Sequence, residues 1–183
     1  MNTLLKKCLA ATLMFGSLLS ISAMTPASAA APTSDLKGKN VVLVHGAFAD
    51  GSSWDKVIPL LQAKGLHVVA VQNPLSSLDG DVAATRRVIE QQDGPVILVG
   101  HSWVGAVITQ AGTDDKVTQP AWQTRPSWFV VAQKDRMIPP ALQDAMAHQI
   151  GATVVKVDAS HVAMLSKPTE VAAAIIEAAR AAQ

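Results

Sequence analysis

The chain of 183 residues contains no Tyr and a single Cys, and aromatic residues make up only 4% of it. One cysteine excludes an intramolecular disulfide framework and a zinc site built from several thiolates. Lys and Arg number 15 against 14 Asp and Glu, which gives a formal net charge of +1 with no block of like charge. The sequence therefore lacks the basic patch that binds nucleic acids or anionic membranes, and we expect neither partner.

The N-terminal segment has the pattern of a secretory signal peptide. Lys6 and Lys7 precede an uncharged, mostly apolar stretch over 8–24, and Ala27-Ser28-Ala29 offers an Ala-x-Ala cleavage site. The alternative is a permanent membrane anchor, but four hydroxyl side chains make the stretch a weak membrane span. We predict a signal peptide over 1–29, a secreted or periplasmic product, and no stable membrane insertion after cleavage.

The rest of the chain reads as one domain. Residues 30–39 are small and polar and predict a short tether, and the domain is expected over 40–183. Apolar, β-branched runs predict strands at 41–46, 67–72, 95–100, 128–132 and 153–159. Helical spacing predicts intervening helices, among them 52–65, a helix lined by the apolar residues Leu142, Ala145, Met146 and Ile150, and 169–181. The alternation indicates an α/β fold with a mostly parallel sheet of about five strands flanked by helices.

A candidate nucleophile lies between the third strand and its helix, in Gly100-His101-Ser102-Trp103-Val104-Gly105. A serine on such a tight turn projects its hydroxyl above the sheet edge, beside the free N–H groups of the helix. The alternative is that Ser102 is only a small polar residue that caps the start of the helix. The loop after the first strand, His45-Gly46-Ala47, is either an ordinary turn or the source of an oxyanion donor, for which we favour the Ala47 N–H.

A nucleophilic serine needs a base and a group that orients the base. His161 lies just beyond the last strand, at the sheet edge where catalytic groups of parallel sheets gather. Asp135 follows the fourth strand and is the favoured orienting acid, with Asp158 as the second choice. The order Ser102, Asp135, His161 is that of one particular fold.

Four motifs carry a resemblance to small esterase-like members of the α/β-hydrolase superfamily. They are V-L-V-H-G-A over 42–47, V-G-H-S-W-V-G over 99–105, D-R-M-I-P-P over 135–140 and A-S-H over 159–161. The resemblance implies a hydrolase of small carboxylic esters that works through an acyl-enzyme without cofactor or metal. It implies that Ser102 is the nucleophile, Asp135 the acid and His161 the base. The oxyanion hole would be the N–H groups of Ala47 and Trp103. Cyanohydrin lyases and cofactor-free perhydrolases share this fold and would use the same three residues.

The chain departs from the family pattern in two places. Val104 replaces the glycine expected two residues after the serine, where a branched side chain would crowd the turn. A strand and the helical cap are also missing, since only 113–126 separates the third helix from the fourth strand. Strand 128–132 must therefore pair with 95–100 or leave a gap. We expect either arrangement to move Asp135 and His161 relative to Ser102 by up to one strand spacing, ~4.8 Å.

The shortened fold also bears on function. Loss of the cap predicts an open, wet site, and the uncovered sheet edge favours self-association. The competing hypothesis is an inactive, shortened hydrolase fold that binds a small ligand.

Overall fold

The computed structural model describes residues 36–113 and 120–182, so the predicted signal peptide and most of the tether lie outside the described residues. Leu36 is buried in the core, and the Gly38 N–H donates to the Gly65 carbonyl at 3.0 Å. Of the helices in these two ranges, none has the length and apolar character to cross a membrane.

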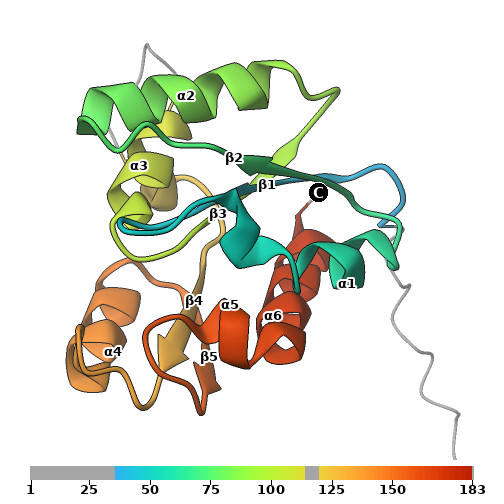
Figure 1. Cartoon of the computed structure of the whole chain (residues 1–183). Helices are drawn as coiled ribbons and strands as arrows, with labels where there is room; N and C mark the ends of the chain where they lie inside the picture. The colour runs from blue at the N-terminus through green and yellow to red at the C-terminus, as the bar shows by residue number, and fades with distance from the viewer. Residues whose placement is uncertain (1–35, 114–119, 183) are drawn as a thin grey trace, which may run out of the picture. The chain divides into compact units, whose positions relative to one another are not determined.

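Strands and helices alternate along the chain (Figure 1). The strands are β1 (Asn40–Val44), β2 (His67–Val71), β3 (Val96–Gly100), β4 (Trp128–Ala132) and β5 (Thr153–Val157). The helices are α1 (Ile58–Gln62), α2 (Leu78–Glu90), α3 (Val104–Ala111), α4 (Pro140–Gln149), α5 (Ala163–Ser166) and α6 (Pro168–Ala181). Two short 3₁₀ helices cover Gly51–Trp54 and Ala121–Gln123. The predicted α/β class is confirmed.

The five parallel strands form two sheets rather than one. β1 pairs with β2 and with β3, and β4 pairs with β5. β3 and β4 do not pair, so of the two sequence alternatives the gap is the one that occurs. The gap follows from the short connection between α3 and β4, which supplies no strand among its described residues.

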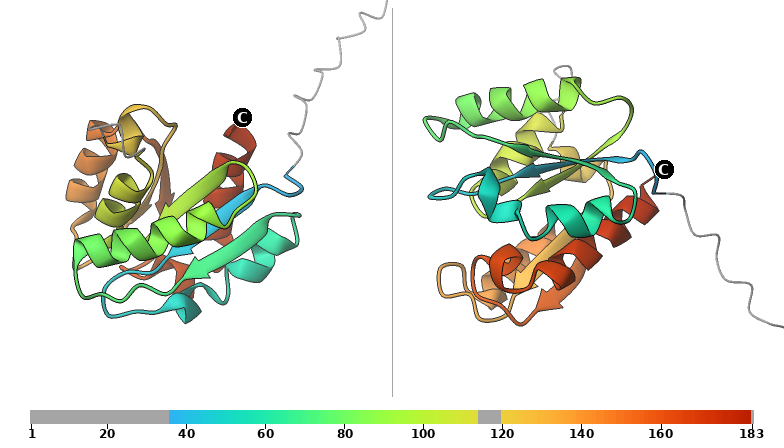
Figure 2. Two further views of the ribbon diagram at one scale, coloured as in Figure 1. Left: turned by 90° about the horizontal axis from the view of Figure 1, so that it is seen from above. Right: turned by 45° about the vertical axis from the view of Figure 1, so that its right-hand side comes forward.

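The side chains of β1 alternate between two apolar cores because successive residues of a strand point to opposite faces. Val41 and Leu43 join the core that contains residues of α1 and α6, whereas Val42 and Val44 join the core that contains residues of α2 and α3. Figure 1 and Figure 2 show α2 and α3 on one side of the three-stranded sheet and α1 and α6 on the other.

One core holds the two sheets together. Helix α6 contacts β3 as well as β4 and β5. Its buried Val171 and Ile175 belong to the same core as Val157 of β5, and Val99 of β3 packs against that core. The edge of β3 therefore keeps a defined position relative to β4 without strand pairing.

Two helix predictions need correction. The helix expected over 52–65 is a 3₁₀ turn followed by the five-residue α1, with Pro59 in its first turn, where the missing N–H of proline costs no helix bond. In α4, Leu142 and Met146 are exposed, and the buried residues are Gln143 and Ala147. A polar residue occupies the core face of α4 because its side chain has partners there, as described below.

Candidate active site

The turn after β3 holds Ser102 in a left-handed conformation, with φ of 57°. Such a φ is uncommon for a residue other than glycine and persists only where the surroundings impose it. Gly100 and Gly46 allow neighbouring backbone segments to approach closely at this turn, because neither carries a Cβ. A Cβ on Gly100 would lie 3.0 Å from the Val104 carbonyl oxygen, and one on Gly46 would lie 2.9 Å from the His101 carbonyl oxygen.

Val104, which replaces the glycine expected two residues after the serine, does not disrupt this turn. It begins α3, and its side chain is fully buried in the core that contains Val42 and Val44. The branched side chain is therefore accommodated by apolar packing, and Ser102 keeps its left-handed backbone.

The structure brings the three predicted site residues together. His161 Nε2 lies 2.9 Å from Ser102 Oγ, and His161 Nδ1 lies 2.8 Å from Asp135 Oδ2. The missing pairing between β3 and β4 therefore does not move Asp135 and His161 away from Ser102 by a strand spacing. His161 follows β5 and Asp135 follows β4, so both hydrogen-bonding partners of the imidazole come from the ends of parallel strands.

Asp135 accepts four hydrogen bonds and is only 7% exposed. Its Oδ1 accepts the backbone N–H groups of Met137 at 2.7 Å and Ile138 at 3.1 Å, and its Oδ2 also accepts Gln143 Nε2 at 3.0 Å. Burial alone would raise the pKa of Asp135, but the hydrogen bonds from His161, Ile138 and Met137 outweigh it and lower the pKa below its usual 3.8. The carboxylate is therefore ionised beside the imidazole at neutral pH.

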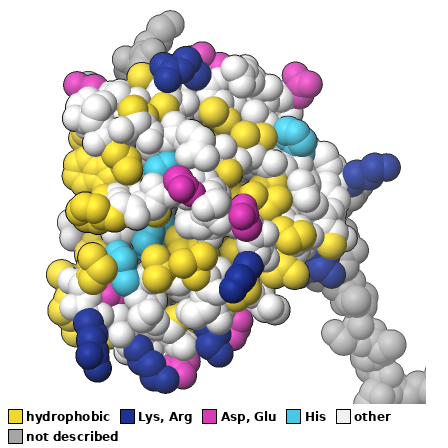
Figure 3. Space-filling view, in the orientation of Figure 1, with side chains coloured by type: hydrophobic (Ala, Val, Ile, Leu, Met, Phe, Trp, Pro, Cys, Tyr) yellow, Lys and Arg dark blue, Asp and Glu magenta, His cyan; other side chains and the backbone are white. Residues whose placement is uncertain are grey.

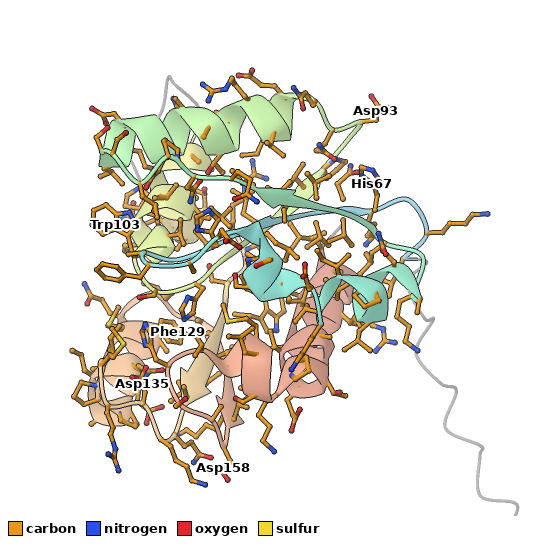
Figure 4. The ribbon with its side chains drawn as sticks, in the orientation of Figure 1. His67, Asp93, Trp103, Phe129, Asp135 and Asp158 are labelled. Atoms are coloured by element: carbon orange, nitrogen blue, oxygen red, sulfur yellow. The ribbon has the colours of Figure 1, made fainter. Side chains whose placement is uncertain are left out.

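Asp158, the second choice for the acid, lies elsewhere. Its Oδ2 pairs with Lys134 Nζ at 2.7 Å, and both side chains are exposed. Figure 4 shows Asp158 at the bottom of the view, apart from Asp135.

His101 links the serine turn to the loop of His161. Its Nε2 lies 2.8 Å from the His161 carbonyl oxygen, so it donates there, and the two rings are 4.8 Å apart. Burial is the main cause that lowers the pKa of His101 below 6.5. The neutral ring thus serves as a donor that ties β3 to the β5 loop.

The N–H of Trp103 belongs to the serine turn, and that of Ala47 follows Gly46, on which a Cβ would lie 3.3 Å from Ser102 Cβ. Neither N–H has a hydrogen-bond acceptor among residues 36–113 and 120–182. The loop that carries Ala47 is anchored by His45, which is 1% exposed and whose Nε2 accepts the Asn73 N–H at 3.0 Å. His45 is thus a structural residue that anchors this loop.

Apolar side chains are exposed next to this site. Phe48 is fully exposed, and Met137 and Trp103 are partly so. Figure 3 shows histidine side chains beside a hydrophobic cluster on the left of this face. Ser102 is itself exposed, so the site is open to solvent.

Gln143 and Asp81 are site residues that the sequence reasoning missed. Gln143 is buried and, besides donating to Asp135, accepts the Ala132 N–H at 2.9 Å through Oε1. Asp81 accepts the indole N–H of Trp103 at 3.1 Å. Neither belongs to a motif, and only a polar residue on the inner face of each helix could have signalled them. The residues that the structure describes contain no group of three or more potential metal ligands.

Comparison with known proteins shows which family the chain resembles. The model of the alpha/beta hydrolase family matches residues 41–118 and 107–174. No curated protein matches the chain.

Several solved structures share the fold. A pyrethroid hydrolase from Sphingobium faniae JZ-2 is 18% identical with a TM-score of 0.64, and the match covers 79% of this chain and 98% of that one. Polyneuridine aldehyde esterase is 16% identical with a TM-score of 0.67, covering 77% and 99%. A thioesterase domain from the curacin biosynthetic pathway is 14% identical with a TM-score of 0.62, covering 78% and 92%. The family model spans well over half of the sequence, and the chain therefore belongs to the alpha/beta hydrolase family.

Proposed function

We propose that this protein is a serine hydrolase that cleaves small carboxylic esters through Ser102, His161 and Asp135. The observation that carries the proposal is the unbroken hydrogen-bond chain from Ser102 Oγ through His161 to Asp135, with links of 2.9 and 2.8 Å. Nucleophile and base are at the distance that proton transfer requires, and a buried carboxylate orients the base. The family and its esterase and hydrolase neighbours support the same reaction class.

The proposed reaction has two halves. His161 Nε2 accepts the Ser102 proton while Oγ attacks the ester carbonyl, and the resulting imidazolium is stabilised by the Asp135 carboxylate. His161 then returns the proton to the leaving alcohol as the carbon–oxygen bond breaks, which leaves an acyl-serine. In the second half a water molecule, deprotonated by His161, releases the acid and restores Ser102.

Charge develops on the carbonyl oxygen in both halves. We assign its stabilisation to the N–H groups of Ala47 and Trp103, which have no protein acceptor among the described residues. Trp103 directly precedes α3, so the positive end of the helix dipole adds to the same effect.

The experiment is hydrolysis of p-nitrophenyl acetate by the wild type, Ser102→Ala and His161→Gln. Matched controls are Ser166→Ala and His148→Gln, which alter exposed residues of α5 and α4. We expect each site variant to lose at least about 10³-fold in kcat and both controls to keep the wild-type rate. A wild-type rate no higher than that of Ser102→Ala would favour the inactive, ligand-binding alternative.

We also propose that the domain acts after export, because residues 1–29 have the charge and hydropathy pattern of a signal peptide. N-terminal sequencing of the protein recovered from the periplasm or medium tests this directly. A mature chain that begins near Ala30 would support export, whereas an intact Met1 in a cytoplasmic fraction would contradict it.

A further inference from the structure

A pocket of about 320 Å³ opens beside the serine turn. It is lined by Ala47, by Trp103, by residues 75–78 and by Asp81. Trp103 follows Ser102 in the chain, and a Cβ on Gly46, the neighbour of Ala47, would lie 3.3 Å from Ser102 Cβ. The pocket, which we call the Trp103 pocket, is thus next to the nucleophile and at the small end of the range for ligand sites, about 300–1,000 Å³.

The position of the Trp103 pocket determines which part of an ester it can receive. Its lining residues come from the loop after β1, from the segment that enters α2 and from the serine turn. Within the described ranges none of its lining belongs to 128–166, the part of the chain that carries Asp135 and His161. The leaving alcohol must lie near His161 Nε2 to receive its proton. The alcohol therefore occupies the His161 side, and the acyl group extends into the pocket.

Asp81 gives this pocket a negative charge. The side chain is 1% exposed, its Oδ1 accepts the Leu75 N–H at 2.8 Å, and its Oδ2 accepts Trp103 Nε1–H at 3.1 Å. Both oxygens are used as acceptors, as in an ionised carboxylate. Leu75 is held at φ of 54°, and the same carboxylate fixes both this loop and the Trp103 indole, which line the pocket.

The charge of Asp81 has no cation opposite it in the lining. Among the described residues that line the pocket there is no Lys or Arg. An acyl group with its own carboxylate would bring a second negative charge within a few ångströms of Asp81, at a protein surface where like charges repel more strongly than in bulk water. An uncharged acyl group meets only apolar walls, two serine residues and an already satisfied carboxylate.

We propose that the Trp103 pocket binds the acyl group and that Asp81 makes the enzyme select uncharged acyl groups over those that carry a carboxylate. This inference rests on the ester hydrolysis proposed above. Asp81 is then a specificity-determining residue, and its second role is to position Trp103.

The test compares ethyl butyrate with monoethyl succinate, whose acyl groups have the same four-carbon backbone and differ by the carboxylate. Hydrolysis is followed by pH-stat titration at pH 8 for the wild type, Asp81→Asn and Asp79→Asn. Asp79 lies in the same turn of α2 but is exposed, so its variant is the matched control for a lost charge. We expect the wild type to favour ethyl butyrate in kcat/KM by about tenfold or more, Asp81→Asn to lose most of that preference, and Asp79→Asn to retain it.

Asp81→Asn turns an amide N–H toward the Trp103 indole N–H, which could disturb the fold. The double variant Asp81→Asn/Trp103→Phe removes this conflict and keeps the backbone N–H of residue 103. The inference is refuted if the folded double variant discriminates against monoethyl succinate as strongly as Trp103→Phe alone, or if the wild type hydrolyses both esters equally well. Failure of the wild type to hydrolyse either ester would instead refute the proposed function.

Discussion

Replacing Asp135 by Asn should remove nearly all esterase activity while the site keeps its shape. The two backbone N–H groups at Oδ1, from Met137 and Ile138, require an oxygen there. The amide nitrogen of Asn then takes the place of Oδ2, which lies 2.8 Å from His161 Nδ1. The amide donates to Nδ1, so the imidazole carries its proton on Nε2 and can no longer accept one from Ser102.

The size of this effect follows from the tautomer. The wrong tautomer in a Ser-His-Asp triad lowers kcat by about 10⁴-fold, which corresponds to about 5.5 kcal/mol at ~1.36 kcal/mol per factor of ten. A separate cost falls on stability, because Gln143 Nε2 loses its 3.0 Å bond to Oδ2 in a buried position. An unsatisfied buried donor costs about 1–3 kcal/mol, so the free energy of unfolding should fall by that amount.

The assay is kcat for a chromogenic ester together with urea unfolding, with Asp158→Asn as the matched control. The exposed pair of Asp158 and Lys134 contributes about 0–1 kcal/mol, so the control should retain both kcat and stability. A larger loss of kcat in Asp158→Asn, or an Asp135→Asn enzyme within about tenfold of wild type, would refute the assignment of the acid.

Two further predictions concern the turn around Ser102. Gly46→Ala places a Cβ 2.8 Å from His101 Nδ1 and 2.9 Å from the His101 carbonyl oxygen, so urea unfolding should show a loss of about 1–3 kcal/mol. Gly105→Ala, whose Cβ meets nothing within 4 Å inside α3, should instead gain about 0.5–1 kcal/mol, and equal effects would contradict the packing argument. Burial lowers the pKa of the His101 ring in the folded state. Just below pH 6.5 the unfolded chain therefore binds a proton at this ring that the folded protein does not bind. The free energy of unfolding accordingly falls as the pH drops through this range. His101→Gln, which can still donate to the His161 carbonyl, should show a shallower fall in urea midpoint between pH 7 and pH 5, and an unchanged slope would exclude His101 as the cause.

The sequence predicted which residues would gather at the site because each follows a strand. Parallel strands end at the same edge of a sheet, so the positions after the predicted strands 95–100, 128–132 and 153–159 are expected to be neighbours in space. In the structure His161 does lie within hydrogen-bond distance of both Ser102 and Asp135. Their catalytic roles remain a prediction until activity is measured.

The expected shift of the acid and base does not occur, for a reason that strand counting cannot supply. The relative position of β3 and β4 depends on packing against α6 and on the bond from His101 Nε2 to the His161 carbonyl. Both are contacts between residues far apart in the sequence. Periodicity describes only neighbours along the chain and therefore left the gap open as one of two alternatives.

The helix errors have a similar origin. Leu142 and Met146 fit an apolar stripe, but Gln143 takes the buried face because Ala132, Ile138 and Asp135 supply partners for its amide. Tertiary hydrogen bonds thus override the hydrophobic pattern of α4. Asp81 is buried for the same kind of reason, since it satisfies two N–H groups from other segments.

The most direct test of the central claim is covalent labelling of Ser102 with a fluorophosphonate probe, read by intact-mass and peptide mass spectrometry. We predict that the wild type gains one adduct on Ser102, that Ser102→Ala gains none, and that His161→Gln reacts far more slowly. Labelling of the wild type no greater than that of Ser102→Ala, or an adduct on a different serine, would contradict the account.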